Sequence, residues 1–278
     1  MDITDLDLDR SLPADRIAAE VVRIRGGRRA PASAQDVLAE ETPIALTYNG
    51  ISHATMLASP TDLEDFAMGF SLTEGIVDAA RDVRDIVLNV SDDGVVVDIE
   101  IASACMARLK TRRRALSGRT GCGLCGVETL PEVLRPVAPV TATTVMRLAD
   151  LLAGMQAMRH AQVLHGATGA THAAAWLTAT GALHAVREDV GRHNALDKLI
   201  GALARASMTA VDGAFLVSSR ASFEMVQKTA AAGCPILAAV SAPTGLAVRL
   251  AHTSGVTLAG FVRGDDATLY THPQRLPD

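Results

Sequence analysis

The C-terminal half of the chain alternates short apolar runs with longer segments in which apolar residues recur at helical spacing. Such runs are typical of strands buried on both faces, and the segments between them are typical of helices that cover a sheet. The alternation therefore predicts an α/β sheet with helices on both faces. The predicted strands are residues 173–178, 183–186, 214–218, 236–240 and 256–262, and the predicted helices are residues 190–206, 221–232 and 244–252.

The N-terminal half follows a different, β-rich pattern. Residues 43–48 and 51–58 are separated by Asn49-Gly50, the pair best suited to a type I′ hairpin turn. Residues 86–90 and 95–101 predict a second hairpin. These features indicate a smaller, β-rich subdomain before the α/β domain.

Capping residues and prolines divide the chain further. Thr61-Asp62-Leu63-Glu64 has the pattern of a capping box, so we expect a helix to begin there. Prolines mark a linker over residues 131–142, and residues 144–158 predict a helix after it. The expected parts are a loosely ordered lead-in (1–18), a β-rich α+β subdomain (19–130) and an α/β domain (143–278).

Composition narrows the classes of function. Hydrophobic residues make up 49% of the 278 positions, so the chain can bury a sizeable core. Aromatic residues make up only 3% of the chain, so few side chains are available for nucleic-acid bases to stack on. The net charge of −5 also argues against nucleic-acid binding. The N-terminus is acidic and alternating, unlike a secretory signal. The uncharged stretch 229–248 contains glycines and prolines, so we expect no membrane span.

We therefore expect a soluble cytoplasmic protein whose four cysteines stay reduced. Cys234 lies beside an apolar run and is predicted to be a small buried residue, whereas the role of Cys105 stays open. Cys122 and Cys125 lie in a glycine-rich segment, Gly121-Cys122-Gly123-Leu124-Cys125-Gly126. Thiols at this spacing can bind a metal, exchange disulfides or carry a sulfur atom.

A basic segment with no acid precedes the two cysteines. Its basic residues are Arg108, Lys110, Arg112, Arg113, Arg114 and Arg119. Clustered positive charge favours the thiolate, the form that attacks sulfur or binds metal. The alternative is half of a structural zinc site, completed by His165, His172 or His193. Because the chain has no second Cys-x-x-Cys pair, sulfur chemistry is favoured and no metal is expected.

Polar clusters follow several predicted strands, where ligands of α/β sheets gather. Residues 187–198 contain acids, arginines, a histidine and an asparagine at a strand-to-helix junction, and residues 218–224 and 241–244 form two similar junctions. Hydroxyls and free N–H groups at a helix start can hold a phosphate, although ordinary helix capping explains part of each cluster. Residues 261–266 suit a nucleotide or phosphate contact or a surface turn.

Taken together, these segments resemble the FdhD family, the sulfur carriers required for formate dehydrogenase activity. The resemblance extends from about Pro43 to Tyr270. The motifs that carry it are Tyr48-Asn49-Gly50, residues 62–70, Cys122-Gly123-Leu124-Cys125-Gly126, Thr171-His172-Ala173-Ala174, residues 187–201, Ser219-Arg220-Ala221-Ser222-Phe223-Glu224, Ser241-Ala242-Pro243 and Gly260-Phe261-Val262-Arg263.

The resemblance implies a sulfurtransferase with a cytidine-deaminase-like fold that forms homodimers. It implies that Cys122 takes persulfide sulfur from a cysteine desulfurase. The sulfur then passes to the molybdenum cofactor, a bis-molybdopterin guanine dinucleotide, before the cofactor enters formate dehydrogenase. From the spacing, we hypothesise that Cys125 releases the sulfur by closing a disulfide onto Cys122. The alternative is a cofactor-binding chaperone in which the cysteines only order a loop.

The family assigns the segment that matches residues 261–266 to cofactor binding, and a guanine nucleotide is expected to mimic the cofactor. We further expect the phosphates of the cofactor at the strand-to-helix junctions. The candidate cofactor-binding residues are Phe261, Val262, Arg263, Gly264, Asp265 and Asp266, with Arg187, Asp189, His193, Asn194, Ser219, Arg220 and Lys228.

Overall fold

The structure is a computed structural model that describes residues 11–116 and 136–278. Its N-terminal lobe is a four-stranded sheet in the order β6-β5-β8-β7, in which β5 and β8 are parallel and the outer pairs antiparallel. The helix α1 (Leu63–Thr73) packs on the apolar face of this sheet. The strands are β5 (Thr42–Tyr48), β6 (Ile51–Ala58), β7 (Val83–Ser91) and β8 (Gly94–Ile101), and the helix α2 (Ser103–Leu116) follows.

The C-terminal lobe is a six-stranded mixed sheet in the order β10-β9-β11-β12-β13-β14. The central strands β11, β12 and β13 are parallel, and the hairpins β9–β10 and β13–β14 extend the sheet on either side. The strands are β9 (His172–Thr178), β10 (Leu183–Asp189), β11 (Gly213–Val217), β12 (Ile236–Ala239), β13 (Thr257–Arg263) and β14 (Asp266–Thr271).

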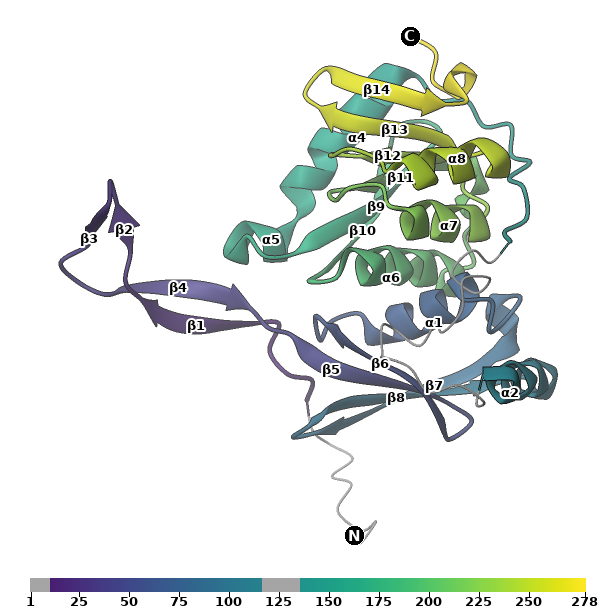
Figure 1. Cartoon of the computed structure of the whole chain (residues 1–278), viewed down its shortest axis with the longest axis horizontal. Coiled ribbons are helices and arrows are strands. Elements are labelled where there is room, and N and C mark those ends of the chain that lie inside the picture. Colours follow the sequence, from purple (N-terminus) through teal and green to yellow (C-terminus); the bar gives the residue numbers. More distant parts are fainter. Residues whose placement is uncertain (1–10, 117–135) are drawn as a thin grey trace, which may run out of the picture.

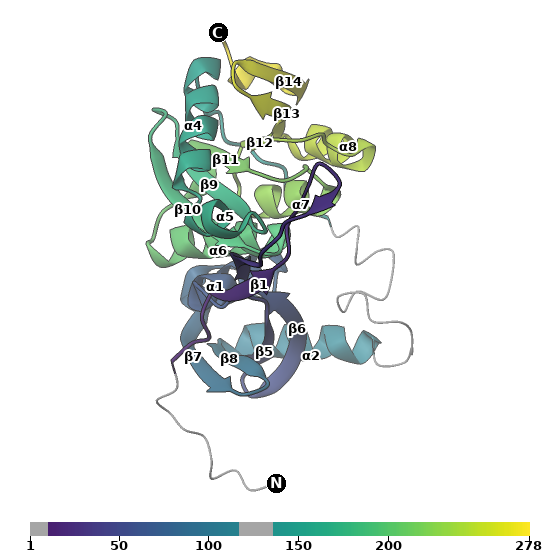
Figure 2. The ribbon, with the colours of Figure 1, turned by 90° about the vertical axis from the view of Figure 1, so that its left-hand side faces the viewer.

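Helices cover both faces of this sheet, as expected from the sequence (Figures 1 and 2). The helix α4 (Leu148–Ala161) packs on one face, and α6 (Arg192–Arg205), α7 (Phe223–Ala231) and α8 (Gly245–Ser254) pack on the other. The helix α6 also packs against α1, so the two lobes meet through these two helices. The fold is thus mixed α/β, and the cytidine-deaminase-like arrangement stays a prediction.

A two-stranded ribbon, which we call the arm, extends away from the body (Figure 1). It consists of β1 (Arg16–Val21) paired with β4 (Ala34–Ala39), and its tip is the small pair β2 (Ile24–Arg25) and β3 (Arg28–Arg29). β1 begins inside the segment predicted to be a loosely ordered lead-in.

The structure corrects several predicted helix boundaries. The capping box at residues 61–64 is wrong: Asp62 is the N-cap residue, with φ 51° and no side-chain capping bond. The helix predicted over residues 144–158 begins at Leu148, because the preceding residues run extended against the C-terminus, where the N–H of Met146 bonds to the carbonyl of Arg275. The helices α2 and α5 (Val163–Thr168) and the strand β14 were not predicted.

Both predicted hairpins are confirmed, and Asn49 and Gly50 have φ of 48° and 73°, as the type I′ turn requires. Short 3₁₀ turns occur at Ala80–Asp82, Ala210–Asp212 and Pro273–Arg275. Within the described ranges, no helix combines the length and the apolar character needed to cross a membrane.

Candidate functional site

Four strands of the C-terminal sheet, β10, β11, β12 and β13, end at the same edge. β9 begins there, because it runs antiparallel to β10 and β11: Asp189 pairs with His172, and Val217 pairs with Ala174. We call this the strand-end edge. It comprises residue 172 and residues 189–194, 218–222, 241–244 and 261–266.

Backbone hydrogen bonds tie the loops of this edge together. The N–H of Ser241 donates to the carbonyl of Ser219 at 3.4 Å, and the N–H of Phe261 donates to the carbonyl of Ser241 at 3.3 Å. The Nε of Arg263 donates to the carbonyl of Val240 at 2.9 Å. The junctions after β11, β12 and β13 therefore form one surface, as the strand-end rule predicts.

Phe261 is held in a conformation that is rare for a bulky residue. Its φ is 53°, in the left-handed region, and the residue is 44% exposed. Val262 is instead fully buried in the core below the sheet, so its side chain cannot touch a ligand, contrary to the prediction. Gly264 supplies a second positive φ, 57°, in the turn before β14. Phe261 and Arg263 are thus both exposed to solvent.

The start of α7 shows neither ordinary side-chain capping nor a complete phosphate site, the two interpretations that the sequence allows for residues 218–224. Ser222 is the N-cap residue, but its side chain makes no capping bond. The acid of the first turn, Glu224, instead accepts a hydrogen bond from Nε2 of His193 at 2.8 Å, and this bond lowers the pKa of Glu224. Ser219 is buried and donates to the carbonyl of Arg220, whereas Arg220 is exposed. Of this junction, Arg220 is the side chain placed to meet an anion from solvent.

Histidine and arginine side chains gather around His172, where β9 begins. His193 of this group was predicted to bind the cofactor, and His165, His172 and His193 were the alternative zinc ligands. Burial lowers the pKa of His172, and Arg192, His165 and His193 lower it further against the opposing effect of Asp189. The Nε of Arg192 is buried without a hydrogen-bond partner among the described residues. Neutral histidine beside a partly unsatisfied guanidinium can accept an anionic group. The signal in the sequence is that His172 begins β9 and that Arg192 and His193 closely follow the end of β10.

Several polar residues of segment 187–198 point to the other lobe instead, whereas Glu188 accepts backbone hydrogen bonds from α5 of its own lobe. Arg187 donates to Asp65 of α1 through Nε and Nη2, at 2.9 and 2.8 Å, and Arg205 also binds Asp65. Arg187 lies 3.5 Å from Asp62 as well. The predicted role of Arg187 in phosphate binding is therefore not supported by its position, since a carboxylate already satisfies its guanidinium.

Asp189 and Asn194 are also committed to the lobe interface. Asp189 forms a fully buried ion pair with Lys198 at 2.7 Å and accepts the N–H of Ser59. Asn194 donates to the carbonyl of Leu57 and to Asp189, both at 3.0 Å. Buried charges need such partners, because an unpaired one costs several kcal/mol (about 3–5). These contacts join β10 and α6 to the end of β6.

Lys228 is the clearest departure from the predicted site. It was expected to reach the phosphate held at Ser219 and Arg220. Its ammonium is instead buried between the lobes and binds Asp197 at 2.9 Å and Glu74 at 3.0 Å. Burial alone would lower the pKa of Lys228, but these carboxylates raise it above its ordinary value, so the ammonium stays charged. The residue faces away from the edge because it lies on the side of α7 that packs toward α1 and α6.

The two lobes approach most closely at a crossing of glycines. A Cβ at Gly201 of α6 would overlap the carbonyl oxygen of Asp65, and one at Gly69 of α1 would overlap that of Asp197. Only glycine allows the two backbones this distance. This crossing and the buried ion pairs form the lobe interface. The interface fixes the orientation of α6, whose first residues belong to the strand-end edge.

The cysteines divide between described and undescribed parts of the chain. Cys122 and Cys125 lie outside the described residues, as do residues 1–10. Cys234 is fully buried, as predicted, and burial raises its pKa to about 12. Cys105 is buried in the N-terminal lobe, 3.4 Å from Arg108, which also binds Asp78. Within the described ranges, the group of potential metal ligands close enough to share an ion is Asp78, Asp82 and Cys105.

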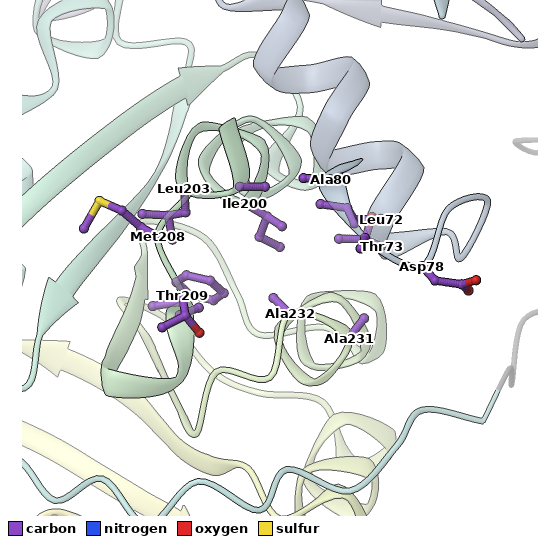
Figure 3. A pocket seen from close by; sticks show the side chains of 14 residues that line it. Leu72, Thr73, Asp78, Ala80, Ile200, Leu203, Met208, Thr209, Ala231 and Ala232 are labelled. Carbon is purple, nitrogen blue, oxygen red and sulfur yellow. The ribbon is translucent and has the colours of Figure 1, made fainter. Parts of the chain in front are cut away.

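A separate cavity of about 380 Å³ lies at the opposite edge of the sheet, between the C-terminal ends of α1, α6 and α7 (Figure 3). Leu72, Ile200, Leu203 and Met208 give it a largely apolar wall. Ligand sites combine apolar walls with several convergent polar groups, and those groups gather at the strand-end edge instead. We therefore place the candidate site at the edge.

The fold is that of a two-lobed mixed α/β protein. Its candidate ligand-binding groups are the exposed polar side chains of the strand-end edge. A sequence profile of the FdhD/NarQ family matches residues 39–277. The chain belongs to the FdhD/NarQ family.

Proteins called sulfur carrier protein FdhD are similar along nearly the whole chain. The one from Bordetella bronchiseptica is 63% identical, covering 94% of this chain and 95% of its own length. The one from Cupriavidus necator is 59% identical over 87% of this chain and 84% of its own. A crystal structure from Desulfotalea psychrophila, described as a formate dehydrogenase accessory protein, has a TM-score of 0.76 and 26% identity, covering 95% of this chain and 100% of that one.

Proposed function

We propose that this protein is a sulfur carrier that serves the maturation of formate dehydrogenase. The observation that carries the proposal is the 63% identity to a protein called sulfur carrier protein FdhD, over almost the full length of both chains. The likeness to a formate dehydrogenase accessory protein supports the second half of the proposal. The protein acts in the cytoplasm as a homodimer.

The proposed transfer begins at Cys122. Its thiolate attacks the outer sulfur of a persulfide on a cysteine desulfurase, the S–S bond of that persulfide breaks, and the desulfurase cysteine leaves as a thiolate. Cys122 then carries the persulfide. Six basic residues precede the motif and favour the anionic forms of both thiol and persulfide.

Delivery follows from the spacing of the two cysteines. The Cys125 thiolate attacks Sγ of Cys122, and the terminal sulfur leaves as sulfide to the acceptor, the bis-molybdopterin guanine dinucleotide form of the molybdenum cofactor. The two electrons come from the cysteine pair, which becomes a disulfide. A cellular dithiol then reduces that disulfide for the next cycle. The protein is thus a sulfurtransferase, and the cofactor is its substrate.

The strand-end edge is the proposed binding surface for that substrate. Arg220 and Arg263 are exposed there, Phe261 offers an aromatic face to a guanine ring, and His193 lies beside them. Arg187, Asp189, Asn194 and Lys228 act instead through the lobe interface. The cytidine-deaminase-like fold, which the resemblance implied, belongs to the same proposal.

Intact-mass measurement tests the sulfur step. Incubation with a cysteine desulfurase and cysteine should add about 32 Da, one sulfur atom, at Cys122, and reductant should remove it. Cys122→Ser should abolish the adduct, whereas Cys234→Ser, which replaces a buried thiol, should retain it. An adduct that maps elsewhere, or none at all, would contradict the proposal and favour the cofactor-binding chaperone.

Guanine nucleotide affinity tests the binding surface. Loss of one charge-assisted hydrogen bond costs about 1.5–3 kcal/mol, so Arg220→Ala and Arg263→Ala should each weaken binding about tenfold or more. The control is Arg81→Ala, an exposed arginine of the N-terminal lobe. Equal affinity in all three variants would remove the strand-end edge from the proposal.

A further inference from the structure

The arm exposes more apolar surface than a ribbon of two strands can support alone. Its strands pair only with each other among the described residues, and only β4 lies beside a helix of the body, α5. Ile24 is 70% exposed and Val22 52% exposed, and Ile17 and Leu38 are exposed as well. An isolated two-stranded hairpin is marginally stable in water, so a partner that covers this surface would stabilise it.

The tip of the arm is also strongly basic. Arg25, Arg28 and Arg29 surround the turn at Gly26-Gly27, and within the described ranges none of the three forms an ion pair. Arg23 binds Asp36 inside the arm at 3.4 Å. Arginines mixed with exposed apolar residues are typical of the centre of a protein interface. An acidic surface would complement the charge of this tip.

This chain has a matching surface on the outer face of its four-stranded sheet. Asp85 of β7 lies directly opposite Glu100 of β8, and like charges in this position are destabilising. Arg84 forms an exposed ion pair with Glu100 at 3.7 Å, but among the described residues no ion pair forms to Asp85 or Asp98. Asp98 adds a third carboxylate, and exposed Val87 lies opposite it. These residues line a hollow of about 340 Å³. We call this surface the acidic face.

We propose that the arm of one copy docks on the acidic face of a second copy. The arginines would neutralise the opposed carboxylates, and the exposed β-branched residues of the two surfaces would cover each other. At about 3.3 Å per residue, the strand from Arg16 to Gly26 spans roughly 35 Å. The arm extends away from its own sheet (Figure 1), so the contact is made between copies.

Two copies that exchange arms make the contact twice, in a closed and symmetric pair. The docking gives a structural basis to the homodimer proposed above, but it does not depend on any step of sulfur transfer. Sulfur loading on Cys122, measured in parallel, can therefore fail while docking holds, or hold while docking fails.

Photo-crosslinking locates the contact. A benzophenone amino acid replaces Ile24 in an equal mixture of ¹⁴N- and ¹⁵N-labelled protein, and mass spectrometry identifies the linked peptides. The expected product joins residue 24 of one isotope to residues 85–100 of the other. Val145, an exposed position away from the arm, is the control site. Links within one chain only, or to another surface, would overturn the docking.

Charge reversal tests the chemistry of the contact. R25E/R28E/R29E and D85K/E100K should each weaken self-association at least tenfold in sedimentation velocity. An equimolar mixture of the two variants should restore the dimer, because each reversed arm then meets an oppositely charged face. R249E is the control, since Arg249 lies on α8. A monomeric wild type, an unaffected dimer, or a mixture that stays monomeric would each refute the proposal.

Discussion

At the interface between the lobes, Lys198 is completely buried against Asp189, whereas at the strand-end edge Arg263 lies exposed with one hydrogen bond to a backbone carbonyl. Both residues belong to polar clusters that follow a strand of the same sheet. The side chains of the first cluster make contacts with the N-terminal lobe, whereas the charged side chains of the second are exposed to solvent. Polar density in a sequence therefore marks a junction without saying whether the junction is structural or binds a ligand.

The physical difference lies in the partners. A buried ammonium or carboxylate must be paired, and pairing leaves no capacity for a ligand. Exposed polar groups at a strand end can still bind a ligand, because a ligand can replace the water that they hydrogen-bond. The strained backbone of Phe261 adds to the contrast, since it has no evident role in packing.

The largest effect is expected where the lobes cross. Gly201→Ala should destabilise the protein by on the order of 4–5 kcal/mol or prevent folding, because the added methyl group overlaps the carbonyl of Asp65. Gly166→Ala is the matched control: this glycine is also helical but has open space around it, so a change within about 1 kcal/mol is expected. Urea unfolding measures both. Equal midpoints would show that the crossing is not close-packed.

The next effect separates the structural role of Lys228 from a role in binding. Lys228→Met leaves Asp197 buried without its ammonium and should cost about 3 kcal/mol. Lys110→Met makes the same change at an exposed position of α2 and should stay within about 0.5 kcal/mol. Unfolding in denaturant gives the comparison. If Lys228→Met were as stable as the wild type but lost nucleotide affinity, Lys228 would instead be a ligand-binding residue.

Phe261 provides a smaller and opposite effect at the edge. A left-handed conformation costs a non-glycine residue about 1–2 kcal/mol, so Phe261→Gly should be more stable than Phe261→Ala by about 1 kcal/mol. Both variants should bind guanine nucleotide more weakly than the wild type, because both lose the exposed ring. Thermal unfolding and calorimetric titration test the two statements separately. A stable glycine variant with full affinity would mean that the strain serves no binding role.

The smallest effect concerns pH. Because the pKa of His172 is lowered in the folded protein, the unfolded chain binds the proton first as pH falls, and stability should decline between about pH 7 and pH 5. His172→Gln should flatten that decline, whereas His160→Gln, at an exposed position of α4, should leave it unchanged. Urea midpoints across this range measure the slope. A slope that His172→Gln does not change would exclude His172 as its source.

Much of the fold follows from local patterns that the structure retains. The apolar runs predicted the central strands to within a few residues, and Asn49-Gly50 predicted its hairpin, since both signals depend on a few neighbouring residues. The helix α2 was missed because its basic residues carry no apolar periodicity. The strand-end rule grouped Ser219, Ser241 and Phe261 correctly, but it also included Lys228, whose direction depends on which face of α7 meets α1.

The amino-acid sequence alone determined the order of strands and helices, the hairpin turns and the membership suggested by the motifs, because these depend on residues close together in the chain. Only the tertiary structure decided which polar residues are available. Asp65 meets Arg187, and Glu74 meets Lys228, across more than one hundred residues of sequence, and no local pattern encodes such a meeting. A charged side chain can be buried only where an opposite charge lies beside it, and these charges come together only when the two lobes pack.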